Sequence, residues 1–161
     1  MKELQKRKPN RRGNYDYSQG GCHFVTICTG DRHELLWEQT PAAGTRNARP
    51  LLSEIGDVVC EAIENIPLIY ESVTVDTYVI MPNHVHLLLV FGDYFGLAAG
   101  APAISTVINK IKGYVSKQTG LSIWEKQFND HVIQSEDDYI YIWQCIDKNP
   151  ANWQDDCFYP K

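Results

Sequence analysis

The most constraining feature of this 161-residue chain is a nearly continuous apolar stretch at residues 78–90 that contains two histidines. Its β-branched and aliphatic residues favour a buried strand. Side chains two positions apart on a strand point to the same face, so His84 and His86 leave the sheet together. Two neutral imidazoles on one face are a ready pair of ligands for a divalent cation. The alternative is a pair of satisfied core histidines, since buried polar groups find partners within the protein.

Length and composition predict one domain spanning residues 1–161. Hydrophobic residues make up 43% of the chain and charged residues 22%, as in ordinary globular proteins. No apolar run approaches the roughly 20 residues of a membrane span, and no apolar segment follows the basic N-terminus, so we expect a cytoplasmic protein. The five cysteines include no C-x-x-C pair, which indicates neither a disulfide framework nor a zinc site.

Charge is distributed unevenly along the chain. The net charge of −5 argues against a protein that coats nucleic acid. Residues 1–20 nevertheless form a basic N-terminal arm, which is either a solvated tail or a phosphate-binding device. The candidate DNA contacts in this arm are its clustered cations Lys6, Arg7, Lys8, Arg11 and Arg12.

The periodicity of the remaining chain predicts the order β, α, β, β, α, β, α. Strands are expected at 22–29, 72–79, 83–90 and 124–133, and helices from Ser53 to Ile66, at about 104–118, and from Ser135 to about 149. This order predicts an α+β, ferredoxin-like (RRM-like) sandwich with an antiparallel sheet. The histidine strand would be central, with helices on one face and an added C-terminal helix. Residues 30–50 are expected to form a loop, and the Gly/Ala-rich segment 91–102 is a candidate hinge.

Several motifs resemble one family. Met81-Pro82-Asn83-His84-Val85-His86 resembles the histidine–hydrophobic–histidine (HUH) strand of the single-tyrosine transposases of insertion sequences and of the REP-associated tyrosine transposases. Tyr114-Val115-Ser116-Lys117-Gln118 matches the spacing of that family's tyrosine nucleophile and a further metal ligand. Trp124, residues 128–133 and Asn149-Pro150 are similar to its C-terminal half, so the resemblance covers nearly the whole chain.

The resemblance implies a mechanism. His84, His86 and Gln118 would hold one divalent cation, and Tyr114 would attack a DNA phosphate to give a 5′-phosphotyrosine. Imidazole ligands favour Mn²⁺, whereas cellular abundance favours Mg²⁺. The implied partners are single-stranded DNA hairpins, either transposon ends or REP-like palindromes. Family members work as homodimers that share an active site or as monomers, and both states stay open. Considered alone, Tyr114 is more typical of a tyrosine at the edge of the core, and the spacing to Gln118 and the resemblance reverse that preference.

Other polar residues receive supporting roles. His131 is expected either to be structural or to orient a metal ligand, with Asp130 as its candidate partner. Lys110, Lys112 and Lys117 are candidate phosphate contacts. Two alternative functions remain. One is a domesticated REP-type protein that binds or nicks hairpins without transposing, and the other is a metal-dependent hydrolase that uses water.

Overall fold

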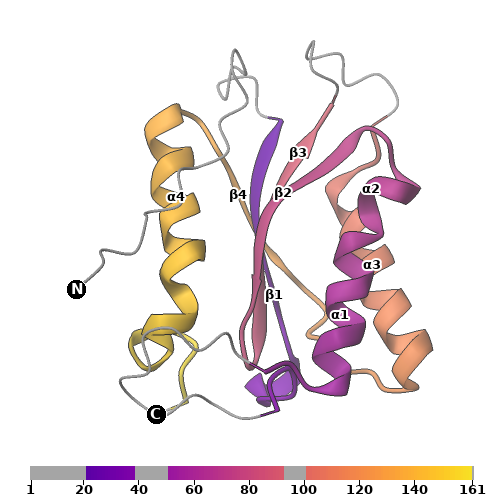
Figure 1. Cartoon of the computed structure of the whole chain (residues 1–161). Helices are drawn as coiled ribbons and strands as arrows, with labels where there is room; N and C mark the ends of the chain where they lie inside the picture. The colour runs from indigo at the N-terminus through magenta and orange to yellow at the C-terminus, as the bar shows by residue number, and fades with distance from the viewer. Residues whose placement is uncertain (1–20, 39–50, 93–100, 161) are drawn as a thin grey trace.

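A computed structural model describes residues 21–38, 51–92 and 101–160 of the chain (Figure 1). The predicted basic arm, residues 39–50 of the predicted loop and residues 93–100 of the predicted hinge lie outside these described residues. The strands are β1 (Cys22–Cys28), β2 (Val73–Ile80), β3 (His84–Phe91) and β4 (Asn129–Val132). The helices are α1 (Glu54–Glu64), α2 (Ile66–Ile69), α3 (Ile104–Thr119) and α4 (Glu136–Lys148), with short 3-10 helices η2 (Gly30–Arg32) and η3 (Asn149–Asp155).

The four strands form one antiparallel sheet in the order β2-β3-β1-β4. The histidine strand β3 is therefore internal, and the predicted α+β, ferredoxin-like fold is confirmed. Its neighbour β1 places Thr26 opposite His86 and Cys28 opposite His84. The last strand is shorter than predicted, because Trp124 forms only an isolated bridge with Thr29 before β4 begins.

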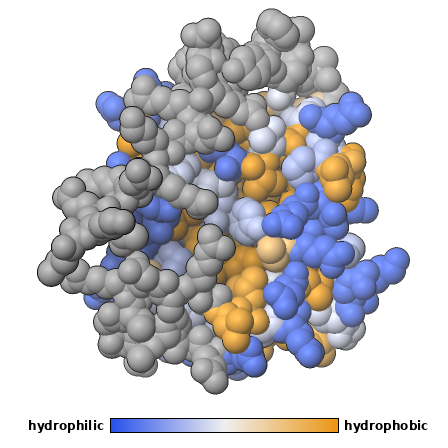
Figure 2. Space-filling model, in the orientation of Figure 1, coloured by the Kyte–Doolittle hydropathy of each residue, from blue (hydrophilic) through white to orange (hydrophobic). Residues whose placement is uncertain are grey.

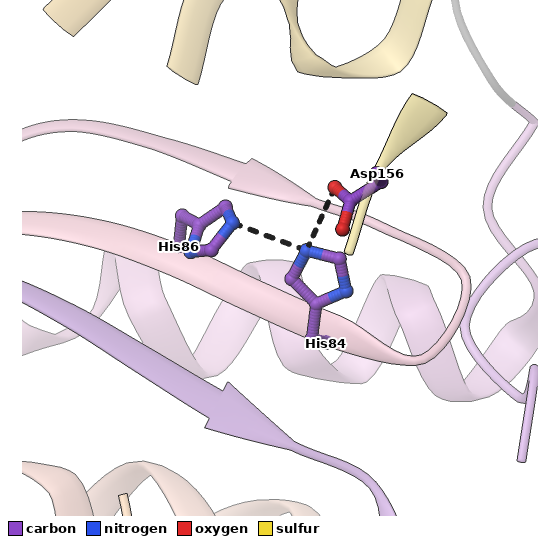
Figure 3. A group of neighbouring side chains, drawn as sticks. All are labelled: His84, His86 and Asp156. Atoms are coloured by element: carbon purple, nitrogen blue, oxygen red, sulfur yellow. Dashed lines mark hydrogen bonds and ion pairs between the residues drawn. The ribbon is translucent and has the colours of Figure 1, made fainter. Parts of the chain in front are cut away.

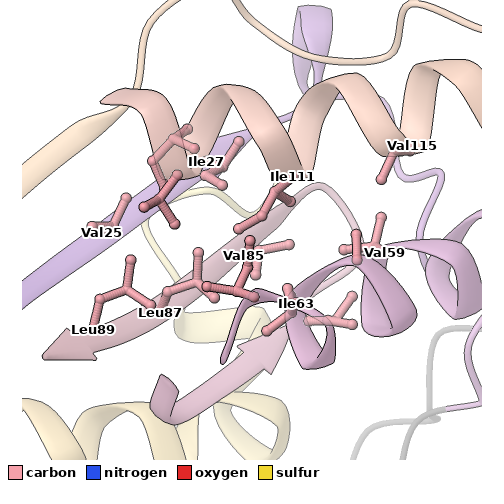
Figure 4. Packing of buried hydrophobic residues seen from close by; sticks show 14 of the residues in the cluster. Val25, Ile27, Val59, Ile63, Val85, Leu87, Leu89, Ile111 and Val115 are labelled. Atoms are coloured by element: carbon pink, nitrogen blue, oxygen red, sulfur yellow. The ribbon is translucent and has the colours of Figure 1, made fainter. Parts of the chain in front are cut away.

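One face of the sheet is covered by α1 and α3, and the main hydrophobic core lies between these helices and the sheet (Figures 1 and 4). Alternate residues of β3 point into this core, namely Val85, Leu87 and Leu89, and all three are fully buried. The helices contribute the stripes that their three-and-four spacing predicts. These residues are Val59, Ala62 and Ile63 from α1 and Val107, Ile108, Ile111 and Val115 from α3.

Helix α1 shows how the sequence sets its ends and its exposed side. The Ser53 hydroxyl accepts a hydrogen bond from the Gly56 amide at 3.1 Å, which caps the helix as predicted. Acidic residues occupy the outer side of α1, and Figure 2 shows this hydrophilic surface beside hydrophobic side chains. The helix ends at Glu64 rather than at Pro67. Pro67 instead lies in the first turn of α2, where the missing N–H carries no penalty.

The opposite face of the sheet is covered by α4, which therefore lies apart from the other helices (Figure 1). Here the other set of β3 side chains, including Leu88 and Val90, packs against Tyr139, Ile142, Trp143 and Ile146. After α4, η3 brings the C-terminal segment back against the sheet and buries Trp153. No helix among the described residues is both long enough and apolar enough to cross a membrane. This second face is the one to which His84 and His86 belong.

Candidate metal centre

His84 and His86 point from β3 to the side of the sheet on which α4 and the C-terminal segment lie (Figure 3). Their Nε2 atoms are 3.1 Å apart. The His84 side chain is completely buried, and His86 is partly buried. The predicted pairing of the two imidazoles on one face is therefore present in the structure.

Asn83 determines which nitrogen of His84 carries the proton. The Asn83 Nδ2 group donates to the backbone oxygens of Arg32 at 3.3 Å and Phe158 at 2.8 Å, which fixes the orientation of the amide. The amide oxygen must then face His84, whose Nδ1 lies 2.8 Å away. Since that oxygen only accepts, His84 Nδ1 carries the hydrogen and its Nε2 presents a lone pair. Asn83 thus prepares His84 as a ligand through Nε2.

His86 is held through its other nitrogen by β1. The Thr26 hydroxyl lies 2.8 Å from His86 Nδ1, and Thr26 is only 5% exposed. A hydroxyl can accept a hydrogen bond from Nδ1–H or donate one to a bare nitrogen. Thr26 therefore accommodates either tautomer of His86, including the one in which Nε2 presents a lone pair to a metal ion.

Asp156, immediately after η3, supplies the third group (Figure 3). Its Oδ1 accepts a hydrogen bond from the Phe158 amide at 2.8 Å, while its Oδ2 lies 3.6 Å from His84 Nε2. The Asp156 side chain is only 5% exposed. All three side chains are therefore anchored through one atom and turn a second atom toward a common point.

The ligand atoms of His84, His86 and Asp156 all lie within 4.8 Å of one another. A lone pair of His84 faces a carboxylate oxygen and a second imidazole, an arrangement that favours a positive charge between them. Ligands that lie about 2.1 Å from an ion in adjacent octahedral positions are about 3.0 Å apart, close to the observed separation of the Nε2 atoms. Two imidazoles and a carboxylate fit Mn²⁺ and also accept Mg²⁺.

The electrostatics keep both imidazoles in the form that binds metal. Burial lowers the pKa of His84 to about 2, and the nearby charges of His86 and Arg32 act in the same direction. Burial lowers the pKa of His86 to about 4, although the Asp156 carboxylate opposes this effect. Both side chains are therefore neutral at neutral pH, as a ligand must be.

Tyr114 and Gln118 lie elsewhere in the chain. Both are on α3, which packs on the opposite face of the sheet from the histidine pair (Figure 1). The Tyr114 hydroxyl interacts with Glu61 of α1, and this hydrogen bond raises the pKa of Tyr114. Gln118 is exposed. The residue that lies beside the two histidines, where Gln118 was expected, is Asp156. Within one chain the predicted convergence does not form, so the roles of Tyr114 and Gln118 stay predictions.

The predicted partnership of Asp130 with His131 is wrong. Neighbouring residues on a strand point to opposite faces, so the two side chains find different partners. Asp130 accepts a hydrogen bond from His23 at 2.8 Å, whereas His131 pairs with Asp138 of α4 at 2.9 Å. The groups that orient His84 and His86 are instead Asn83 and Thr26.

The three lysines of α3 occupy different environments. Lys110 lines a cavity of about 230 Å³ that also involves Tyr114, and Lys117 is exposed. The Lys112 ammonium donates to three backbone oxygens, those of Glu125, Lys126 and Gln127. Lys112 therefore fastens α3 to the segment before β4, whereas the other two lysines remain available for the predicted phosphate contacts.

Comparisons with known proteins were made for the whole chain. No protein-family model matches it. A protein of unassigned function from Haemophilus influenzae is 24% identical over 176 residues, which span 97% of this chain and 94% of that protein. A solved REP-associated tyrosine transposase bound to a REP hairpin superimposes with a TM-score of 0.61 and 21% identity, over 95% of this chain and 74% of that one. A candidate transposase from Deinococcus radiodurans R1 is 16% identical, with a TM-score of 0.49 over 79% of this chain and 88% of that one.

The hairpin-bound structure shares the fold of this chain and comes from the family that the sequence motifs resemble. The class of protein that fold and site define together is therefore an α+β, ferredoxin-like domain with a candidate His-His-Asp metal centre on one face of its sheet.

Proposed function

We propose that this protein is an HUH-type transposase, a metal-dependent transesterase that cleaves and rejoins single-stranded DNA beside a hairpin. The observation that carries the proposal is the convergence of His84, His86 and Asp156. Each of these side chains is held by a hydrogen bond at the atom that does not face the common point, which is Nδ1 of each histidine and Oδ1 of the aspartate. The shared fold with a REP-associated tyrosine transposase that was bound to a REP hairpin supports DNA hairpins as the substrate.

The proposed reaction exchanges one phosphodiester bond for another. A tyrosine oxygen attacks the phosphorus, the bond from phosphorus to the 3′ oxygen breaks, and the proton lost by the phenol ends on the released 3′-hydroxyl. A later hydroxyl group reverses the exchange and restores the DNA strand, so no external energy source is needed. A divalent cation held by His84, His86 and Asp156 would supply Lewis-acid stabilisation of the phosphate charge.

Tyr114 is the nucleophile that the sequence motif favours. Since it lies on the far side of the sheet from the histidines in its own chain, this role requires Tyr114 of a second copy at the metal centre. Helix α3 would then also bring Gln118 and the exposed Lys117 to the bound strand. The proposal in this form includes a homodimer with a shared active site.

Tyr139 is the candidate within a single chain. It lies on α4, on the same side of the sheet as the histidines, and is only 1% exposed. Its hydroxyl donates to Asp76 Oδ2 at 2.7 Å, so a carboxylate already stands where the phenol proton would go. This form of the proposal needs no second copy, but the phenol must leave its buried position to reach a phosphate.

A labelled hairpin with a single-stranded flank tests the proposal. The protein is incubated with this DNA and Mn²⁺, and a denaturing gel separates free DNA, cleaved DNA and a covalent protein–DNA product. We expect cleavage with a covalent product that disappears in His84→Gln. Cleavage without any covalent product would favour the hydrolase that uses water, and binding without cleavage would favour a domesticated hairpin-binding protein.

Two variants and a mixture identify the tyrosine. Tyr114→Phe and Tyr139→Phe each remove one candidate hydroxyl and keep the ring. If Tyr114 acts in a second copy, a mixture of Tyr114→Phe and His84→Gln proteins regains the covalent product, because one active site of the mixed dimer is complete. If Tyr139 acts within one chain, Tyr139→Phe abolishes the product whereas Tyr114→Phe does not, and a mixture of Tyr139→Phe and His84→Gln proteins does not restore it.

A further inference from the structure

The loop after β1 holds a strained backbone next to the metal centre. Asp31 and Arg32, both within η2, have φ angles of 52° and 57°. This left-handed conformation is disfavoured for residues that carry a Cβ, and two in succession are uncommon. Such strain persists where the surrounding structure enforces it, and it is frequent at functional sites.

The same loop is fastened to the residue that orients His84. The Thr29 amide donates to the backbone oxygen of Asn83 at 2.9 Å. In return, the Asn83 amide group donates to the backbone oxygen of Arg32 at 3.3 Å. Arg32 is therefore held in a defined position relative to the metal ligands.

The guanidinium of Arg32 lies beside the centre. Its carbon is 4.5 Å from the centroid of the Phe158 ring, and that ring is 4.5 Å from the His84 imidazole. Its Nε pairs with Glu125 at 3.1 Å and its Nη1 donates to Cys28 Sγ at 3.1 Å. Because the ion pair with Glu125 is about 40% exposed on the Arg32 side, it contributes little to stability and does not account for the strained backbone.

The charges of the centre call for a further cation when a phosphate is bound. Two neutral imidazoles, one carboxylate and a divalent ion carry a net charge of about +1, whereas charge accumulates on the phosphate oxygens during transfer. A guanidinium matches two phosphate oxygens with parallel N–H groups. Phe158 contacts both Arg32 and His84, so a group that takes the place of its ring would meet both of them.

We propose that Arg32 contacts the non-bridging oxygens of the DNA phosphate bound at the His84–His86–Asp156 centre, where that phosphate takes the place of the Phe158 ring. This inference rests on the proposed function and adds the residue that recognises the phosphate group. In this proposal the Arg32 side chain serves to bind the substrate rather than to stabilise the fold.

The test compares wild type with Arg32→Ala, Arg32→Lys and the matched control Glu125→Gln, which removes the ion pair and keeps the arginine. Three quantities are measured: Mn²⁺ affinity, the salt dependence of binding to a single-stranded hairpin oligonucleotide in Mn²⁺, and the cleavage rate. For Arg32→Ala we expect Mn²⁺ affinity within about 3-fold of wild type, a salt slope smaller by about 0.7 and cleavage slower by about 100-fold. Arg32→Lys should recover the salt slope, and Glu125→Gln should match wild type in all three.

Equal losses in Arg32→Ala and Glu125→Gln would overturn the proposal, as would an unchanged salt slope or a loss of Mn²⁺ affinity in Arg32→Ala. If circular dichroism shows that Arg32→Ala does not fold, Arg32→Gln replaces it with the same expected values. A wild-type protein that binds the hairpin without cleaving it removes the transesterase function, and the salt slopes still decide the role of Arg32. Equal cleavage rates in wild type and Arg32→Ala would overturn the role of Arg32 and leave the proposed transesterase function standing.

Discussion

The two faces of the sheet are built from alternate residues of the same strand, yet they serve different purposes. Val85, Leu87 and Leu89 of β3 point to the α1–α3 side, where the described neighbours form a continuous hydrophobic core (Figure 4). His84 and His86 point to the α4 side (Figure 3), where hydrogen bonds with the adjacent Asn83 and with Thr26 of β1 hold them in place. A single strand thus carries both the stability and the candidate chemistry of the domain.

This difference shows how a buried polar centre can be tolerated. The apolar face gains free energy in proportion to the area removed from water and needs no precise partners. The histidine face needs a polar partner for its buried imidazoles, and Asn83 and Thr26 provide one for each Nδ1 atom. We therefore expect substitutions on the first face to change stability and substitutions on the second to change metal binding.

The largest expected effect is on the apolar face. Leu87→Ala should lower the free energy of unfolding by about 4 kcal/mol, because it leaves a cavity at a fully buried position. Chemical denaturation measures this loss. Mn²⁺ affinity of the variant that remains folded should stay within about 3-fold of wild type, since no metal ligand is altered. A large loss of Mn²⁺ affinity in the folded variant would show that the two faces are not independent.

The pH dependence of stability reports on the histidine face. The pKa of His86 is lowered from 6.5 to about 4 in the folded protein, so between these values the unfolded chain binds a proton that the folded chain does not. His86 should therefore lower the free energy of unfolding of the metal-free protein by an amount on the order of 3 kcal/mol as the pH decreases from about 6.5 to about 4, in addition to the loss that His84 contributes in the same direction. Denaturation at several pH values, with His86→Gln as the control, measures this effect. Equal pH dependence in the two proteins would contradict it.

Asn83 links stability to metal binding, and two substitutions separate its roles. Asn83→Ala removes the acceptor that fixes the His84 tautomer and should weaken Mn²⁺ binding by about 10- to 100-fold. Asn83→Asp keeps an acceptor for His84 but loses the hydrogen bonds donated to Arg32 and Phe158. It should therefore bind Mn²⁺ more tightly than Asn83→Ala. Calorimetric titration of both variants measures the difference, and equal affinities would argue against control of the tautomer.

The smallest expected effect is at the cap of α1. Ser53→Ala removes the hydroxyl that accepts from Gly56 and should cost about 1 kcal/mol of stability. Mn²⁺ affinity should not change, because α1 lies on the other side of the sheet from the histidines. Thermal unfolding with and without Mn²⁺ checks both statements. A weaker stabilisation by Mn²⁺ in the variant would show that α1 acts on the metal centre.

Local patterns predicted the fold well, because the information they use is short-range. Strand alternation and helical spacing placed β3 inside the sheet, and the Ser53 and Ser135 caps begin α1 and α4 as predicted. The end of α1 was predicted less well, because Pro67 is as compatible with the start of a helix as with its end. The last strand was predicted too long, because Trp124 pairs with Thr29 only in an isolated bridge and the ladder with β1 begins at Asn129.

The candidate site was predicted only in part, because its remaining members come together through tertiary structure. His84 and His86 share a strand, so their spacing alone revealed them. Asp156 lies 70 residues further along the chain and is brought back by η3, which no local pattern indicated. Asn83 stands next to His84 in the sequence, and an amide directly before a buried imidazole is a local signal for an acceptor that orients it.

The most direct test of the account is a crystal structure of the protein soaked in Mn²⁺, with the ion located by its anomalous scattering. We predict one strong peak bonded to Nε2 of His84, Nε2 of His86 and a carboxylate oxygen of Asp156. A peak bonded to other residues, or an empty site at saturating Mn²⁺ with the three side chains unchanged, would contradict the metal centre from which the proposed function is derived.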